Sequence, residues 1–258
     1  MFSDLMFCII LKIKNNNMDK ENVLMPKVLI CAPQNENKNY VWEKWINNVR
    51  NFTYPKDRLE IFIADNSISE DNCNKLKFQG IKSVHTPQHE KGLLYTINDS
   101  HEACRQYAIK NGFDFMLHLE TDIIPPIDVI ERLMNNNKKV CAGVYDLFYG
   151  YERRPMIQLD EEYDRNVREY RNPEFVTVEE PLFFDGKVKQ VYHAGLGCVL
   201  IHKSVFERIE FRVDERYDFH TDTWFANDCY LLNINIYADT NIQCEHYNGT
   251  WLGIKEIK

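Results

Sequence analysis

The sequence predicts a single α/β domain with an open, mostly parallel central sheet flanked by helices. First, from residue 27 onward short β-branched segments alternate with segments of helical periodicity, which is the pattern of βαβ units. Second, the chain has 258 residues, 44% of them hydrophobic and 27% charged, which is enough for one large domain and is typical of globular proteins. Third, no internal repeat or low-complexity linker marks a second domain.

The first half of the chain contains three expected strands and two expected helices. Pro33 ends the buried run KVLICAP, because proline cannot donate to a central ladder, and Gly112 is a typical helix terminator. Between them, apolar residues recur either in short runs or at helical spacing. The expected elements are a strand at 27–33, a helix at 40–52, strands at 59–67 and 81–87, and a helix at 92–112.

The second half continues the alternation after an apolar run that ends in acidic residues, FMLHLETD. The stretch at 149–190 is charged, rich in tyrosine and without clean periodicity, and a segment of this length is more often functional than a simple connection. We therefore expect it to be a mobile lid or acceptor segment. The other expected elements are strands at 115–122 and 139–147, a helix at 127–135, a strand and short helix at 191–209, a helix at 221–234 and a strand at 236–248.

Residues 1–25 form an N-terminal extension by this interpretation. The apolar stretch from Leu5 to Ile13 is too short for a membrane span of about 20 residues. It also lacks the basic segment and the small-residue cleavage site of a signal peptide. The extension is expected to be a disordered tail, an extra edge strand, or a segment upstream of a start at Met18 or Met25.

Charge and cysteine usage restrict the class of protein. The net charge is -8, which disfavours a surface that coats nucleic acid, because phosphate contacts come mainly from Lys and Arg. The 8 cysteines are scattered without a C-x-x-C pair, which indicates thiols in a reducing compartment. No other long apolar run is present, so we expect a soluble, cytoplasmic protein without an integral membrane segment.

Polar residues follow the ends of several expected strands, where ligands bind in open α/β sheets. Glu120 and Asp122 are separated by one residue, so on a strand their side chains would point the same way. Two such carboxylates repel each other unless a cation lies between them, and hard divalent cations take oxygen ligands. The pair therefore predicts a metal site. An acidic cap for the helix after Pro125 and Pro126 is the alternative, and the residues alone leave both open.

Six segments, in order, resemble motifs of GT-A-fold glycosyltransferases, particularly inverting enzymes like those of family 2. The segment LHLETDIIPP resembles the D-x-D strand, ICAPQNEN the opening strand, and IADNS the strand end that meets the nucleotide base. KGLLYTIN is similar to the loop and helix start beside the nucleotide, and HAGLGCVLIHKSVFERI to the acceptor-side strand. The stretch from TDTWFANDCYLL to EHYNG resembles the catalytic helix, the next strand and a terminal histidine.

The resemblance implies a GT-A domain at 26–258, with a Rossmann-like sheet, that transfers a sugar from a nucleotide sugar such as a UDP- or GDP-sugar. It implies Asp222 as the general base, with Asp228 as the fallback and a helix-capping role as the alternative. It implies Mn²⁺ or Mg²⁺ as the cofactor, held by Glu120, Asp122 and His246. The implied donor-binding residues are Pro33, Asn35, Asp65, Asn66, Lys91, Asn98, Glu120 and Thr121.

The acceptor is left open between a glycan, a lipid-linked sugar, a protein and a modified nucleobase. Three residues depart from the family pattern: Glu120 replaces an Asp, Thr221 replaces a Glu, and Ile97 replaces an Arg. These departures keep a catalytically inactive GT-A-like binding module as an alternative. A sugar-phosphate nucleotidyltransferase is the other alternative, although the segment after the first expected strand lacks the Gly-rich basic loop of that class.

Overall fold

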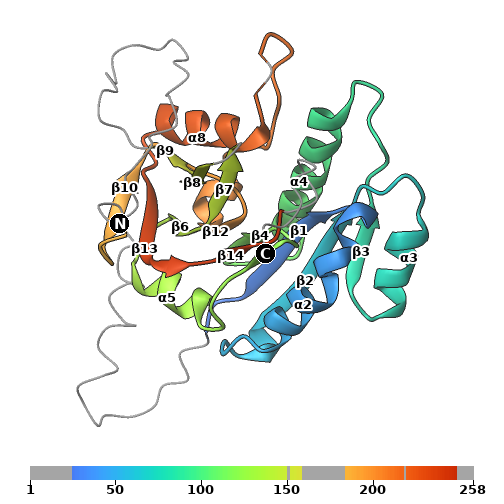
Figure 1. The fold of residues 1–258 in the computed structure, drawn as a ribbon, viewed down its shortest axis with the longest axis horizontal. Coiled ribbons are helices and arrows are strands. Elements are labelled where there is room, and N and C mark those ends of the chain that lie inside the picture. The colour runs from blue at the N-terminus through green and yellow to red at the C-terminus, as the bar shows by residue number, and fades with distance from the viewer. Residues whose placement is uncertain (1–24, 150–151, 159–183, 218, 249–258) are drawn as a thin grey trace.

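The computed structural model describes residues 25–149, 152–158, 184–217 and 219–248. Its centre is an eight-stranded sheet (Figure 1). In order across the sheet the strands are β10 (Val188–Val191), β13 (Ile236–Gln243), β6 (Val140–Val144), β12 (Cys198–His202), β4 (Phe115–Leu119), β1 (Val28–Gln34), β2 (Leu59–Asp65) and β3 (Lys82–His85).

The sheet is mostly parallel, which confirms the predicted α/β class. Strands β4, β1, β2 and β3 pair in parallel, and so do β6 and β13. β12 runs antiparallel between β4 and β6, and β10 runs antiparallel to β13. Because β4, β1 and β2 share one direction, their carboxyl ends meet at one edge of the sheet. The antiparallel β12 begins at that same edge, with Cys198 opposite Leu119.

Helices cover both faces of the sheet because alternate residues of each strand point to opposite sides (Figure 1). Leu29 and Cys31 of β1 belong to the core under α4, α7 and α8, whereas Val28 and Ile30 belong to the core under α2 and α5. The helices are η1 (Glu36–Lys38), α2 (Asn39–Arg50), η2 (Lys56–Arg58), α3 (Asp71–Phe78), α4 (Leu93–Lys110), α5 (Val129–Asn135), α7 (Lys203–Phe206) and α8 (Thr221–Leu231).

Three short strand pairs lie outside the main sheet, and two of them join segments that are distant in the sequence. The first pairs β5 (Ile123–Ile124) with β14 (Glu245–His246), so the end of the described chain lies beside the segment that leaves β4. The other pairs are β7 (Asp146–Tyr149) with β8 (Glu152–Pro155), and β9 (Ile157–Gln158) with β11 (His193–Ala194).

The structure differs from the expected elements in several respects. Pro33 does not end the first strand, because β1 continues to Gln34 and Pro33 lies opposite Ala64 of β2. The strand expected at 236–248 is two strands, β13 and β14. The helix α3 was not expected, because only Asn72, Cys73 and Leu76 of it are buried and its sequence has little apolar periodicity. The strand expected at 139–147 is two strands, β6 and β7. The carboxylates after β4 lie in a turn, because β4 ends at Leu119.

Two predicted segments lie largely outside the described residues. They are the N-terminal extension at 1–25 and the lid or acceptor segment at 149–190, of which 149, 152–158 and 184–190 are described. Within the described ranges, no helix combines the length and the apolar character that crossing a membrane requires.

Candidate functional site

A cavity of about 370 Å³ opens where β1, β2 and β4 end. This volume lies in the usual range for small-molecule sites. Five of the predicted site residues line it: Pro33, Asn35, Asn66, Glu120 and Asp222. Pro33 lies in the last residues of β1. Asn35, Asn66 and Glu120 directly follow β1, β2 and β4, and Asp222 comes from the first turn of α8. The cavity therefore brings together residues from four distant parts of the chain.

Asn35 and Asn66 join the ends of β1 and β2. The Asn35 amide nitrogen donates to both the backbone oxygen and the side-chain oxygen of Asn66, each at 3.1 Å. The Asn35 side-chain oxygen accepts from Asn37 N at 3.1 Å and so caps η1. The backbone of Glu36 donates to Ser67 Oγ at 2.9 Å. These hydrogen bonds, most of them between a side chain and a backbone atom, hold this wall of the cavity in place.

Asp65 lies behind this wall and not on it. It is fully buried, and its Oδ1 accepts hydrogen bonds from Ser67 Oγ at 2.8 Å and from Asn72 Nδ2 at 2.6 Å. In this arrangement Asp65 orders the loop that carries Asn66. Its predicted contact with a nucleotide base stays a prediction, because the carboxylate does not line the cavity.

Three other predicted donor-binding residues also lie outside the cavity wall. Lys91 is half exposed and pairs with Glu215. Asn98 on α4 accepts a hydrogen bond from Thr221 Oγ1 at 3.3 Å, which links α4 to the start of α8. Thr121 is buried and donates to the side-chain oxygen of Gln34. The structure gives each of these residues a packing or tethering contact.

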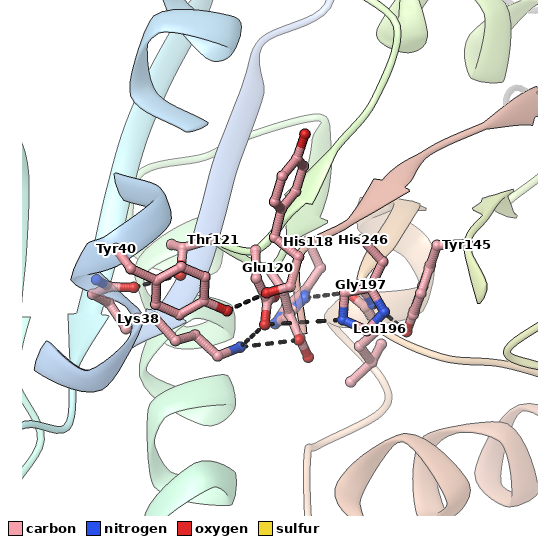
Figure 2. Close-up of polar contacts among 12 residues, drawn as sticks. Lys38, Tyr40, His118, Glu120, Thr121, Tyr145, Leu196, Gly197 and His246 are labelled. Atoms are coloured by element: carbon pink, nitrogen blue, oxygen red, sulfur yellow. Dashed lines mark hydrogen bonds and ion pairs between the residues drawn. The ribbon is translucent and has the colours of Figure 1, made fainter. Parts of the chain in front are cut away.

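Glu120 and Asp122 converge although they occupy a turn. Glu120 N donates to Gly197 O at 3.0 Å, and Ile123 N donates back to Glu120 O at 3.0 Å. The resulting turn directs both carboxylates to one ammonium, that of Lys38 (Figure 2). Lys38 Nζ lies 3.3 Å from Glu120 Oε2 and 2.9 Å from Asp122 Oδ2.

The three charges lie at different depths. The Asp122 side chain is 2% exposed, that of Lys38 12% and that of Glu120 26%, and Lys38 and Glu120 line the cavity. Burial alone would raise the pKa of Glu120, but the Lys38 ammonium lowers it to about 2. Burial disfavours the Lys38 ammonium, but the two carboxylates raise its pKa above the ordinary value. Burial raises the pKa of Asp122 despite the opposing effect of Lys38, and Glu120 adds to the rise. Lys38 is therefore a charged group in contact with both carboxylates.

His246 lies on the far side of Asp122. Its Nδ1 is 2.7 Å from the backbone oxygen of Asp146, and its Nε2 is 3.9 Å from Asp122 Oδ2. A carbonyl oxygen only accepts hydrogen bonds, so Nδ1 carries a proton and the neutral ring has its lone pair on Nε2. This is the tautomer that a ligating histidine adopts when a backbone carbonyl orients it.

Glu120, Asp122 and His246 carry ligand atoms that a divalent cation could use, but these atoms are not arranged as a formed metal site. Within the described residues, no three His, Cys, Asp or Glu side chains lie close enough to hold a metal ion as they stand. Glu120 and Asp122 offer carboxylate oxygens, which suit Mn²⁺ or Mg²⁺, whereas the imidazole nitrogen of His246 is a ligand more typical of transition metals than of Mg²⁺. Asp122 Oδ1 is buried without a hydrogen-bond partner among the described residues. The positive charge that lies between the two carboxylates in this structure is the ammonium of Lys38.

Asp222 lies in the first turn of α8, whose N-cap residue is His220, so the predicted capping role is not the one the structure shows; the role of base stays a prediction. Its Oδ1 accepts from Thr223 N at 2.8 Å, and the same N–H also donates to His220 O at 3.1 Å. Its Oδ2 lies 3.5 Å from Nε2 of His193, a buried residue on β11. Burial alone would raise the pKa of Asp222, but His193 lowers it to about 2. Asp222 is therefore ionised at neutral pH.

The fallback base, Asp228, is committed elsewhere. Both of its carboxylate oxygens accept from the Arg212 guanidinium, at 2.7 Å and 2.8 Å. It does not line the cavity.

The sequence interpretation missed three residues of this site: Lys38, His101 and His193. Lys38 and His101 line the cavity, and His193 contacts Asp222. Each meets its partners only through the fold; Lys38 and Glu120, for example, are 82 residues apart. A lone histidine or lysine without a motif gives no signal in a single sequence.

No protein-family model matches this sequence, and no curated protein sequence matches it either. Solved structures do resemble it. The mannosyltransferase PcManGT from Pyrobaculum calidifontis, in complex with GDP-Man and Mn²⁺, superposes with a TM-score of 0.55 at 12% identity. The similarity covers 94% of this chain and 62% of that one.

S. aureus TarS 1–349, in complex with UDP, superposes with a TM-score of 0.53 at 11% identity, over 88% of this chain and 63% of that one. The chain thus spans less than two thirds of either protein. Similarity at this level of identity shows the fold alone. The chain therefore has the GT-A fold found in glycosyltransferases.

Proposed function

We propose that this protein is an inverting glycosyltransferase that moves a sugar from a UDP- or GDP-sugar to an acceptor hydroxyl. The observation that carries the proposal is the distribution of groups around one cavity. Asn35 and Asn66 offer polar contacts at the strand ends, Lys38 and Glu120 lie at the exit of β4, and Asp222 enters from α8. A site for glycosyl transfer needs these three functions: nucleotide contacts, charge at the leaving group and a base.

Charge stabilisation at the leaving group is the first requirement. Negative charge grows on the nucleoside diphosphate as the glycosidic bond breaks, so positive charge nearby lowers the barrier. A divalent cation, Mn²⁺ or Mg²⁺, would be held by Glu120, Asp122 and His246 and would supply such charge to the diphosphate. The Lys38 ammonium belongs to the same wall of the cavity and is itself a source of positive charge.

Deprotonation of the acceptor is the second requirement, and we assign it to Asp222. In an inverting reaction the acceptor hydroxyl attacks the anomeric carbon from the face opposite the leaving diphosphate, and a carboxylate accepts its proton. A pKa of about 2 makes Asp222 a weak base toward a free alcohol. The acceptor proton becomes strongly acidic as its oxygen bonds to carbon, so a weak carboxylate base suffices late in the reaction. His193 Nε2 lies 3.5 Å from Asp222 Oδ2, and its proximity favours the ionised carboxylate by lowering the pKa of Asp222.

The first test is donor use combined with Asp222→Asn. The full chain is incubated with Mn²⁺ and a panel of UDP-, GDP- and dTDP-sugars, and release of nucleoside diphosphate is measured. Asp222→Asn keeps nearly the same shape but cannot take the proton, so transfer should fall by about 10²- to 10⁴-fold while donor affinity is retained.

Asp128→Asn is the matched control, because it removes a half-exposed carboxylate whose partner, Arg132, lies outside the cavity wall. Its activity should equal that of the wild type. Unaltered transfer by Asp222→Asn would remove Asp222 from the role of base. Nucleotide binding without consumption of any donor would instead favour the inactive binding module.

A further inference from the structure

The Lys38 ammonium contacts both carboxylates that the proposed function assigns to the metal (Figure 2). We propose that Lys38 is a displaceable internal counter-ion. It neutralises Glu120 and Asp122 in the absence of donor, and it moves onto the diphosphate of the nucleotide sugar when a divalent cation binds those carboxylates. This inference rests on the proposed function and deepens it, because it predicts how metal and donor binding are coupled.

The position of Lys38 allows its ammonium to move while its backbone stays fixed. Lys38 is the last residue of η1, and its backbone N–H donates to Asn35 O at 2.8 Å. Asn35 caps the same turn, and Glu36 N is bound to Ser67 Oγ at 2.9 Å. A lysine side chain has a flexible four-carbon stem, so its ammonium can move while the backbone of η1 stays in place. Because Lys38 lines the cavity, a rotation of that stem carries the charge toward a bound ligand.

Electrostatics make the ammonium and a divalent cation alternatives at this position. Glu120 and Asp122 carry their oxygens within 3.3 Å of one nitrogen, so without a cation the two carboxylates would repel each other. A divalent cation bound to these oxygens would lie within a few ångströms of the ammonium. Like charges at such short range in a partly buried site repel strongly. Metal binding therefore requires Lys38 to leave.

A nucleoside diphosphate gives the displaced ammonium a new partner. Phosphate oxygens accept hydrogen bonds from lysine and carry negative charge. When the metal binds alone, its binding free energy is reduced by the loss of the ion pairs between Lys38 and the two carboxylates. When a diphosphate binds as well, Lys38 forms a new ion pair with a phosphate, which offsets that loss. Mn²⁺ and the nucleotide should therefore strengthen each other's binding, and Lys38 should carry part of that coupling.

The test is Mn²⁺ and nucleotide binding by the full-length Lys38→Met variant, which keeps the length of the side chain without its charge. Free Mn²⁺ is followed by electron paramagnetic resonance in the absence of nucleotide, and the variant should bind Mn²⁺ about tenfold more tightly than the wild type, a coupling of about 1.4 kcal/mol. GDP and UDP are then titrated calorimetrically at saturating Mn²⁺. The nucleotide that the wild type binds should bind to the variant about tenfold more weakly.

Opposite changes in the two affinities are the signature of displacement. A residue that only supports the fold would weaken both. Lys82→Met is the matched control, since Lys82 makes an exposed pair with Glu60 at 2.6 Å away from the cavity, and neither affinity should change.

Two results overturn the inference and leave glycosyl transfer at this cavity standing, the second of them without the metal. One is nucleotide binding with no gain in Mn²⁺ affinity for Lys38→Met, and the other is nucleotide binding with no Mn²⁺ binding by either protein. A wild type that binds no nucleotide contradicts the proposed function itself.

If Lys38→Met does not fold, the wild type supplies the measurement. Mn²⁺ alone should then speed acetylation of Lys38 by an amine-directed reagent, read by mass spectrometry of the peptide. An unchanged rate overturns the displacement.

Discussion

His101 shows how burial sets charge at the level of single residues. It is 3% exposed and lines the cavity, with its ring centroid 4.6 Å from that of His118 and 5.4 Å from that of Phe211. Burial lowers the pKa of His101 to about 3, and repulsion by His118 adds to the effect. The ring is therefore neutral at physiological pH and adds no positive charge beside Lys38.

This neutrality predicts an acid-dependent loss of stability. An unfolded histidine has a pKa of about 6.5, so below that pH the unfolded chain takes up a proton that folded His101 does not. Stability is thus retained above pH 6.5 and falls as the pH drops toward 3. With a pKa of about 6.5 in the unfolded chain and about 3 in the folded protein, the linkage between proton binding and folding lowers the free energy of unfolding by about 2 kcal/mol at pH 5.

Denaturant unfolding of the wild type and of His101→Phe at pH 7.5 and pH 5 measures this cost. The variant should gain about 2 kcal/mol relative to the wild type between the two pH values, whatever its stability at neutral pH. A difference between the two proteins that does not change with pH would contradict the assignment of a neutral His101.

At the scale of elements, the turn that leaves β4 depends on the loop between β11 and β12. Gly197 O accepts from Glu120 N at 3.0 Å, and Gly197 N donates to the Tyr145 hydroxyl at 3.1 Å. A Cβ atom on Gly197 would lie 2.5 Å from Tyr145 Cζ, closer than real contacts allow. Glycine here allows the ring and the loop to pack together.

Gly197→Ala should therefore destabilise the fold by about 1–3 kcal/mol, the usual cost of overpacking a buried site. Chemical denaturation checks this. In a Tyr145→Leu background the ring is absent, so the same substitution should cost much less, and the difference between the two backgrounds measures the clash. Equal costs in both backgrounds would show that Tyr145 is not the obstacle.

Burial and apolar periodicity explain which elements could be predicted from the sequence and which could not. β1 was predicted because Val28 to Ala32 form a continuous apolar run, as expected for a strand buried on both faces. α3 was missed because it buries few residues and those are mixed in polarity. Glu120 and Asp122 were expected to share one side of a strand; they lie in a turn, because Glu120 donates its N–H to the loop at Gly197 and the β4 ladder has already ended.

Over the whole molecule, the cavity depends on topology that no local pattern encodes. Antiparallel β12 brings the loop at Gly197 to the carboxyl edge of β4, and the β5–β14 pair brings His246 to Asp122. The resemblance to known glycosyltransferase motifs gave the order of these segments. It could not show that Lys38 would lie between the carboxylates, because that contact depends on how η1 follows β1 in three dimensions.

The central claim is that this edge of the sheet binds a nucleotide sugar with its diphosphate beside Lys38 and Glu120. A crystal structure of the full chain with Mn²⁺ and the nucleoside diphosphate that it binds tests it most directly. The account predicts the diphosphate in the cavity, Lys38 Nζ within hydrogen-bond distance of a phosphate oxygen, and Mn²⁺ on Asp122. A nucleotide bound elsewhere on the molecule, or one bound here with Lys38 still paired to both carboxylates, would contradict it.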